Sequence, residues 1–273
     1  MILDDIVAHK REEVERREAA VTQRELERVA ASRPPALDLA AALRGHGVGL
    51  IGEIKRASPS RGALAPDLDA VETADVYIRN GAAAISVLTD ERFFSGSLAD
   101  LEAAKRTADA SLRAVPILRK DFVVDRYQVV ESRAAGADAV LLIVRILSDD
   151  EMARLGEEIE AWGMTPLVEV YDEEDIARIG ALAPAVVGIN HRNLADFRVD
   201  RSAFGRLRRL LPVTTVVVAA SGVRSAADVA RLGEKGADAV LVGEALVTSD
   251  DPASMVRALA NAGRASRVER SAA

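Results

Sequence analysis

The sequence predicts an α/β fold, a single (β/α)8 barrel with an N-terminal helical extension, for three reasons. Eight short apolar runs alternate with segments of helical periodicity, as parallel strands and their crossover helices do. The length of 273 residues fits the roughly 250 residues of such a barrel. The sequence Gly-Ala-Asp-Ala-Val-Leu occurs at 136–141 and again at 236–241, half a barrel later. The alternative is an open, doubly wound sheet.

Residues 1–47 precede the barrel and are predicted to be largely helical. Residues 3–19 are rich in Glu and Arg, and apolar side chains recur among them at helical spacing. A second helix is expected over residues 24–31, because the two prolines that follow Arg33 cannot continue it. We expect this extension to cap one end of the barrel.

The barrel strands are predicted where short β-branched runs are apolar on both faces, as in strands that helices cover on one side. They are expected at Leu50–Lys55, Ala84–Leu88, Val115–Lys120, Ala139–Val144, Thr165–Val170, Val186–Asn190, Thr215–Ala220 and Ala239–Val242. The clearest helices between them are expected at Leu68–Arg79, Ser97–Ala108, Arg126–Ala135, Asp149–Trp162, Ser202–Leu210 and Ala226–Lys235. The TIM barrel would occupy residues 48–263 of one domain, 1–273, with a polar, disordered tail at 264–273.

Composition excludes several classes of function. With 36 basic and 43 acidic residues the net charge is −7, so no nucleic-acid partner is expected. The chain has no cysteine, which excludes disulfides, thiolate metal sites and a cysteine nucleophile. No apolar run approaches the roughly 20 residues of a membrane span, so no membrane partner is expected. The acidic N-terminus lacks the apolar core of a signal peptide, and we expect a cytoplasmic protein.

Charged side chains interrupt the apolar strands near their C-terminal ends, where barrel enzymes place their catalytic residues. Because strand residues two apart share a face, Glu53 and Lys55 point the same way. The others are Lys120, Glu169 and Asn190, with Arg192 on the parity of Asn190. Each alone could be a structural ion pair. Burying all of them is costly, so together they predict a site for acid–base catalysis.

A phosphate site is predicted after the last two strands. Barrels that bind phosphate use the loops after strands seven and eight and the start of a short helix. Gly222 and Gly243 lie in these loops and let the backbone approach an oxyanion. The segment Ser58-Pro-Ser-Arg-Gly62, in the loop after the first strand, is a candidate anion contact or an ordinary turn.

Three of the five phenylalanines lie in loops after the second and third strands, at Phe93, Phe94 and Phe122. They could stack on a planar substrate group or pack within a lid. The three histidines, at 9, 46 and 191, have no metal-ligand spacing and receive no role; no metal site is expected.

Six segments in order closely resemble the indole-3-glycerol phosphate synthase family of tryptophan biosynthesis. They are residues 53–60, 118–122, 141–144, 167–170, 188–190 and 240–243, the first being very specific to the family. The resemblance extends from the helical N-terminus to about residue 263. It implies a lyase that converts 1-(2-carboxyphenylamino)-1-deoxyribulose 5-phosphate to indole-3-glycerol phosphate, releasing CO2 and water. It also implies no metal or organic cofactor, and a monomer.

The resemblance implies roles for individual residues. Lys120 would protonate the ribulose carbonyl, and Glu53 and Glu169 would transfer protons. Lys55 would pair with the substrate carboxylate and the glutamates, with a role as a second acid as the alternative. The remaining roles follow from position in the same motifs. Hydroxyl and carboxyl groups would be held by Asn190 and Ser221, with Arg192 nearby, and Leu194 would also contact the substrate. The anthranilate pocket would be lined by Phe94, Phe122 and either Leu141 or Leu142. The phosphate would be bound by Gly222, Gly243, Glu244 and Ser58.

One departure from the family concerns catalysis. The family usually has Glu-Ser-Gly at the end of the seventh strand, and this chain has Ala220-Ser-Gly. Because Lys120, Glu169 and Glu53 remain, we predict impaired turnover rather than none. The alternative is a catalytically disabled paralogue that binds the sugar phosphate without turnover. Phosphoribosylanthranilate isomerase, another phosphate-binding barrel, is disfavoured because it needs a cysteine base.

Overall fold

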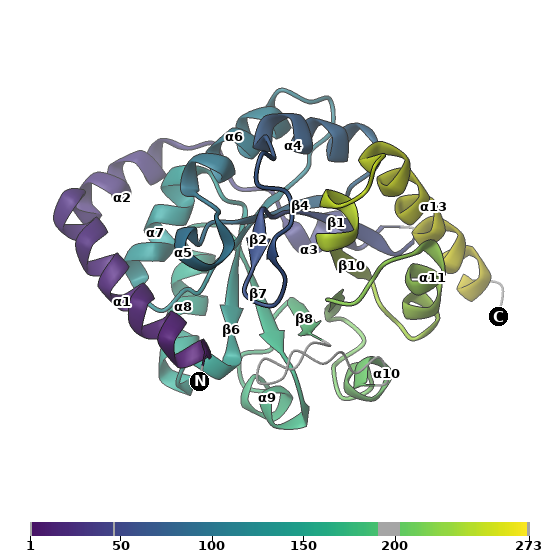
Figure 1. The fold of residues 1–273 in the computed structure, drawn as a ribbon. Helices are drawn as coiled ribbons and strands as arrows, with labels where there is room; N and C mark the ends of the chain where they lie inside the picture. The colour runs from purple at the N-terminus through teal and green to yellow at the C-terminus, as the bar shows by residue number, and fades with distance from the viewer. Residues whose placement is uncertain (1, 46, 191–202, 272–273) are drawn as a thin grey trace.

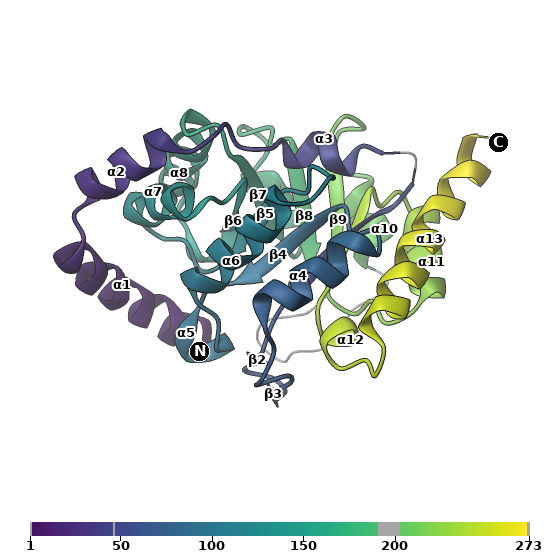
Figure 2. The same cartoon turned by 90° about the horizontal axis from the view of Figure 1, so that it is seen from above.

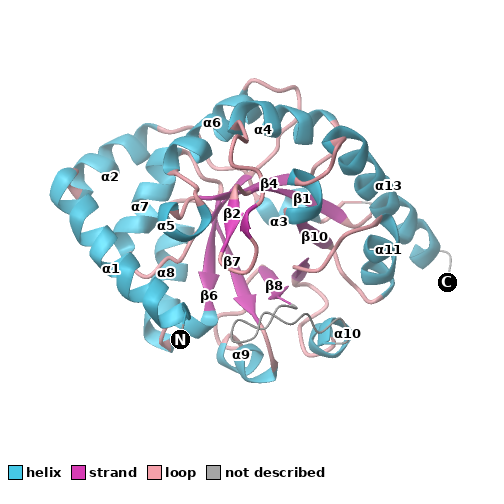
Figure 3. Cartoon of the chain, in the orientation of Figure 1, coloured by secondary structure: helices cyan, strands magenta, loops and turns pink. Residues whose placement is uncertain are grey.

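The computed structural model describes residues 2–45, 47–190 and 203–271, and these form a closed barrel of parallel strands inside a ring of helices (Figures 1 and 3). Strand β1 pairs with both β4 and β10, so the sheet has no free edge and is not an open, doubly wound sheet. The strands are β1 (Gly49–Ile54), β4 (Ala84–Leu88), β5 (Ile117–Lys120), β6 (Ala139–Ile143), β7 (Thr165–Val170), β8 (Val186–Asn190), β9 (Val216–Ala220) and β10 (Ala239–Val242). All eight overlap the predicted strands.

The helices around the barrel begin near their predicted positions because polar residues cap them. Ser97, Asp125, Ser148 and Ser225 each accept a hydrogen bond from a first-turn N–H group. The helices are α4 (Ala70–Arg79), α6 (Leu98–Asp109), α7 (Arg126–Ala135), α8 (Asp149–Ala161), α9 (Glu173–Arg178), α10 (Ala203–Arg208) and α11 (Ala226–Glu234). Shorter elements lie in the loops: β2 (Ala57–Ser58), β3 (Gly62–Ala63), α5 (Glu91–Phe94), the 3-10 helix η1 (Val144–Ile146) and α12 (Glu244–Val247).

The side chains that face the barrel interior change polarity along its axis. Toward the N-terminal ends of the strands these side chains are apolar and form one buried cluster that includes Ile51 and Leu167. Two residues further along the same strands, the interior positions are Glu53 and Glu169, which are also buried. The carboxylates therefore lie at the C-terminal ends of the strands, above an apolar floor that excludes water.

The N-terminal extension reaches both ends of the barrel, rather than capping one end as predicted. Helix α3 (Leu39–Leu43) closes the N-terminal end, where Leu39 and Leu43 join the interior cluster. Helix α2 (Gln23–Ser32) packs on α7 along the side. Helix α1 (Ile2–Ala20) then reaches the opposite mouth, and Figure 2 shows its first residues at the end of the barrel away from α3. Leu3 and Ile6 line the cavity at that mouth.

The C-terminal segment also differs from its prediction. Helix α13 (Pro252–Ser271) continues through most of the tail that was expected to be disordered from residue 264. Residues 264–271 contain neither Gly nor Pro, and three of the eight are Arg, so no residue in them stops a helix. Within the described ranges, no helix is both long enough and apolar enough to span a membrane.

Candidate active site

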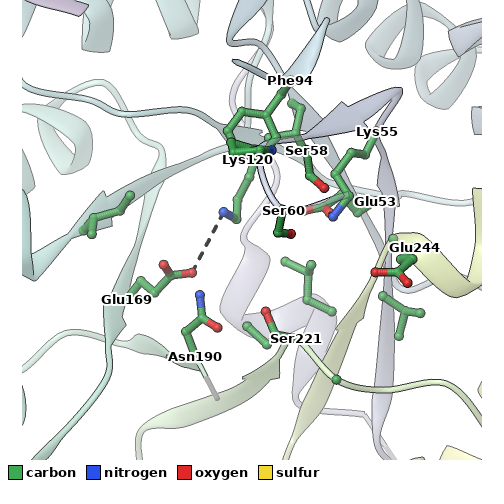
Figure 4. A pocket seen from close by; sticks show the side chains of 18 of the residues that line it. Glu53, Lys55, Ser58, Ser60, Phe94, Lys120, Glu169, Asn190, Ser221 and Glu244 are labelled. Carbon is green, nitrogen blue, oxygen red and sulfur yellow. Dashed lines mark ion pairs between the residues drawn. The ribbon is translucent and has the colours of Figure 1, made fainter. Parts of the chain in front are cut away.

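One cavity opens at the C-terminal end of the barrel, and it brings together most of the predicted site residues (Figure 4). Its walls come from all eight barrel strands and from the loops that follow them. They include the predicted residues Glu53, Lys55, Ser58, Phe94, Lys120, Phe122, Glu169, Asn190, Ser221, Gly222, Gly243 and Glu244. Barrel closure places these residues around one space although they span almost two hundred positions of the chain.

Glu53 and Lys55 form an ion pair on one wall, with 2.9 Å between Nζ of Lys55 and Oε1 of Glu53. The Glu53 side chain is buried, whereas Lys55 keeps partial exposure to the cavity. Gly243 lets the backbone after β10 approach this pair, since a Cβ atom at position 243 would lie 2.5 Å from Oε1 of Glu53. The carboxylate is therefore enclosed between a lysine and a loop that has no room for a side chain.

Lys120 and Glu169 face each other across the cavity, 3.9 Å apart between Nζ and Oε2 (dashed line in Figure 4). Glu169 has a second partner that the sequence analysis missed. The hydroxyl of Tyr171 donates a hydrogen bond to Oε1 of Glu169 and also interacts with the Asn190 side chain. Tyr171 lies two residues after Glu169, so its strand parity could have identified it.

The loops after β9 and β10 form the part of the wall predicted to bind phosphate. Ser221 and Gly222 both adopt left-handed backbone angles, φ 69° and 76°, which turn the chain sharply at the end of β9. Glu244 follows Gly243, and its carboxylate pairs with Arg61, 2.9 Å away, and with Arg224 at 3.7 Å. Arg61 comes from the turn between β2 and β3 and Arg224 from the loop after β9, so both bring positive charge beside the predicted phosphate site.

An apolar wall lies on the other side of the cavity. The rings of Phe94 and Phe122 are 6.0 Å apart between centroids. Phe93 instead packs edge-on against His9 of α1, 5.9 Å away, outside the cavity lining. Ile143, Leu3 and Ile6 complete the apolar surface. Leu3 and Ile6 were not selected from the sequence, because they come from the distant N-terminal helix. Ile143 was not selected either.

Leu141 lies below the cavity rather than in its wall. It is 1% exposed within the interior cluster, and Ile143, two residues along β6, takes the place expected of it. Leu141 and Ile143 both belong to the interior cluster, and Ile143 lies closer to the cavity. Arg192 and Leu194 lie outside the described residues.

Ala220 lines the cavity at the end of β9, where its neighbour in the barrel is Asn190 of β8. It is 4% exposed and faces the interior, as its place in the interior cluster shows. The position therefore points into the site, although its methyl side chain offers no proton donor or acceptor. Within the described ranges, no group of three His, Cys, Asp or Glu side chains could hold a metal ion.

Comparison with solved structures first defines the fold class. A thiamine phosphate pyrophosphorylase from Pyrococcus furiosus matches 82% of this chain and 98% of its own, with TM-score 0.62 and 16% sequence identity. A 3-hexulose-6-phosphate synthase from Salmonella typhimurium matches 79% of this chain and 98% of its own, with the same TM-score and 16% identity. At such identity the likeness shows the fold alone. Fold and cavity together define a (β/α)8-barrel enzyme.

Sequence comparison then identifies the family. The model of the indole-3-glycerol phosphate synthase family matches residues 3–259. Indole-3-glycerol phosphate synthases of Rhodococcus jostii and Streptomyces griseus are 50% and 48% identical over 262 residues, which cover 96% of this chain and 96% of each relative. The enzyme of Mycolicibacterium smegmatis is 47% identical over 96% of this chain and 94% of its own. The chain belongs to this family and is a lyase of tryptophan biosynthesis.

Proposed function

We propose that the cavity binds 1-(2-carboxyphenylamino)-1-deoxyribulose 5-phosphate and closes its indole ring, releasing CO2 and water. This proposal rests on the arrangement of aromatic side chains, lysines and glycine-containing loops around a single cavity. The substrate has an aromatic ring, a carboxylate and a phosphate. The cavity offers the Phe94–Phe122 wall, the two lysines, and the glycine-containing loops after β9 and β10. Each part of the substrate thus has a complementary surface.

Within this reaction, Lys120 is the general acid that protonates the ribulose carbonyl while the anthranilate ring carbon attacks it. Glu169, 3.9 Å from Lys120, and Glu53 transfer protons during ring closure and dehydration. Lys55, already paired with Glu53, binds the substrate carboxylate and holds it near the closing bond. The two lysine–glutamate pairs lie on different strands of the barrel. Each pair can therefore act on a different part of the substrate during ring closure.

The remaining polar residues hold the substrate. The backbone N–H groups of Gly222, Gly243 and Glu244 bind the phosphate, and Ser58 assists them. Pairing with Arg61 supports this assignment for Glu244, because the arginine compensates its carboxylate beside an anionic ligand. Asn190 and Ser221 bind hydroxyl and carboxyl groups. Arg192 and Leu194, which lie outside the described residues, are assigned to substrate contact on family resemblance alone.

The residue at position 220 sets the rate in this proposal. Ala220 supplies neither a charge nor a hydrogen bond where the family usually carries a glutamate, so the lysines and the reacting groups lack one acidic partner. We expect slow but measurable turnover. Ala220→Glu should raise kcat by at least about tenfold, a modest share of what a general acid–base group contributes.

The test follows indoleglycerol phosphate by its fluorescence for the unsubstituted protein, Ala220→Glu and the matched control Ala220→Gln. The amide fills the same volume without a carboxylate. Faster turnover with Glu alone supports an acid–base role for position 220. An inert parent beside an active Ala220→Glu variant would indicate a disabled synthase. If neither protein turns over at high concentration, the roles given to Lys120, Glu169 and Glu53 are wrong.

We further propose a cytoplasmic monomer that needs no metal ion or organic cofactor, as family resemblance implies. Sedimentation equilibrium should give a mass near the 29.1 kDa of the chain. Turnover should survive treatment with a chelator and gel filtration. A mass of twice that value, or activity restored only by added metal, would contradict these two points.

A further inference from the structure

Tyr171 links Glu169 and Asn190 in the site. It follows the last residue of β7, its side chain is almost fully buried, and it lines the cavity. Its hydroxyl donates to Oε1 of Glu169 and interacts with the side chain of Asn190. The other carboxylate oxygen of Glu169, Oε2, faces Lys120 at 3.9 Å. The two oxygens of Glu169 therefore have different partners.

The Tyr171 hydroxyl is a permanent donor. Burial raises its pKa well above the usual value, and the negative charge of Glu169 and the hydrogen bond to it raise the pKa further. A phenol that keeps its proton can donate to a carboxylate but cannot accept a proton from substrate. Tyr171 is thus suited to holding Glu169 rather than to exchanging protons itself.

The ring of Tyr171 is in turn held in place by Arg145. The guanidinium carbon of Arg145 lies 4.5 Å from the ring centroid, in cation–π contact. Arg145 is held by ion pairs to Asp172 and Asp175. Asp175 also accepts the backbone N–H of Tyr171, at 2.8 Å. Both the ring and the backbone of Tyr171 are therefore anchored, so the position of its hydroxyl is set by Arg145, Asp172 and Asp175.

We propose that Tyr171 is a positioning residue for Glu169. By occupying Oε1, its hydroxyl fixes the plane of the carboxylate and keeps Oε2 directed at Lys120 and the substrate. The inference rests on the proposed proton-transfer role of Glu169. A carboxylate free to rotate would spend less time in the geometry that proton transfer requires, which slows the chemical step more than it weakens substrate binding.

The kinetic test is a double-mutant cycle of Tyr171→Phe, Glu169→Gln and both together, with Tyr127→Phe as matched control. Tyr127 is a buried tyrosine whose hydroxyl bonds the carbonyl of Val21, away from the cavity. We expect Tyr171→Phe to lower kcat by about tenfold to a hundredfold with KM changed less than about threefold. In the Glu169→Gln background, the same change should lower kcat less than about twofold.

A cycle in which the two losses multiply would overturn the proposal, as would a Tyr171→Phe variant with the kcat of the Tyr127→Phe control. Crystal structures of the parent and of Tyr171→Phe supply a readout that needs no turnover. The Glu169 carboxylate should rotate or occupy several orientations in the variant only. An unmoved carboxylate refutes the inference even if the parent forms no product, a result that would count separately against the proposed function.

Discussion

Lys10 of α1 is enclosed by carboxylates of the barrel loops, and replacing it with methionine tests how the N-terminal helix is held. Its side chain is 1% exposed, with Nζ 2.9 Å from Asp90, 3.0 Å from Asp121 and 3.0 Å from Glu13. Burial alone would lower the pKa of Lys10, but the charges of Asp121, Asp90 and Glu13 raise it above the usual value. The lysine is therefore charged, and methionine of similar shape would remove only that charge.

The loss should be large because both aspartates are fully buried. Removing one partner of a buried ion pair leaves an uncompensated charge and typically costs about 3–5 kcal/mol. For a chain of this size, about 1 kcal/mol corresponds to roughly 2–4 °C, so we expect Tm to fall by about 6–20 °C. Asp90→Asn should restore part of the loss in the Lys10→Met background. The amide removes the stranded charge and keeps the cap on the Phe93 N–H.

Urea unfolding would be followed by circular dichroism and by the fluorescence of Trp162, the single tryptophan, which packs near α2 in the cluster of Ala30 and Val130. The surface variant Arg79→Met is the control, because its ion pair with Asp75 is exposed and should contribute nothing measurable. If Lys10→Met is no less stable than Arg79→Met, the buried cluster does not hold α1 and the reasoning fails.

Three further predictions concern close packing beside two glycines and stability at low pH. Gly243→Ala should lower kcat/KM by about tenfold to a hundredfold, because its Cβ would meet Glu53 at 2.5 Å. Gly52→Ala should destabilise the fold by about 1–3 kcal/mol, because its Cβ would lie 2.5 Å from the buried Tyr77 ring. Gly156→Ala, which meets nothing within 4 Å, is the control for both; equal effects there would contradict the steric argument. Burial would raise the pKa of Asp121, but Arg119 and Lys10 hold it well below the usual value. Its stabilising contribution is thus complete above about pH 4 and is lost in stronger acid. Asp121→Asn should flatten the dependence of urea midpoints on pH below about 4, and an unchanged slope would contradict this.

The sequence predicted the barrel and its strands closely because their signals are local. Runs such as Ala139–Val144 are apolar on both faces, and only strands covered on both sides need that pattern. The charged site residues were found by the same rule, since Glu53 and Glu169 break apolar strands at the end where barrel sites lie. Parity alone could also have selected Tyr171, two residues after Glu169.

The sequence did not predict how far along the barrel axis each interior side chain lies. Leu141 and Ile143 share one face of β6, and only the stagger of that strand against its neighbours decides which of them reaches the cavity. The partners of the charged residues were likewise undetermined. Pairing of Arg61 with Glu244 joins loops at opposite ends of the chain, and no local pattern specifies it.

The course of the extension was decided by tertiary structure alone. The sequence determined that residues 3–19 form a helix, because helical periodicity depends on neighbours three and four positions away. It did not determine that this helix lies at the mouth of the barrel with Leu3 and Ile6 in the cavity. That placement depends on contacts such as Lys10 with Asp121, 111 positions later in the chain. Such contacts form only once the barrel has closed, so the local sequence carries no signal of them.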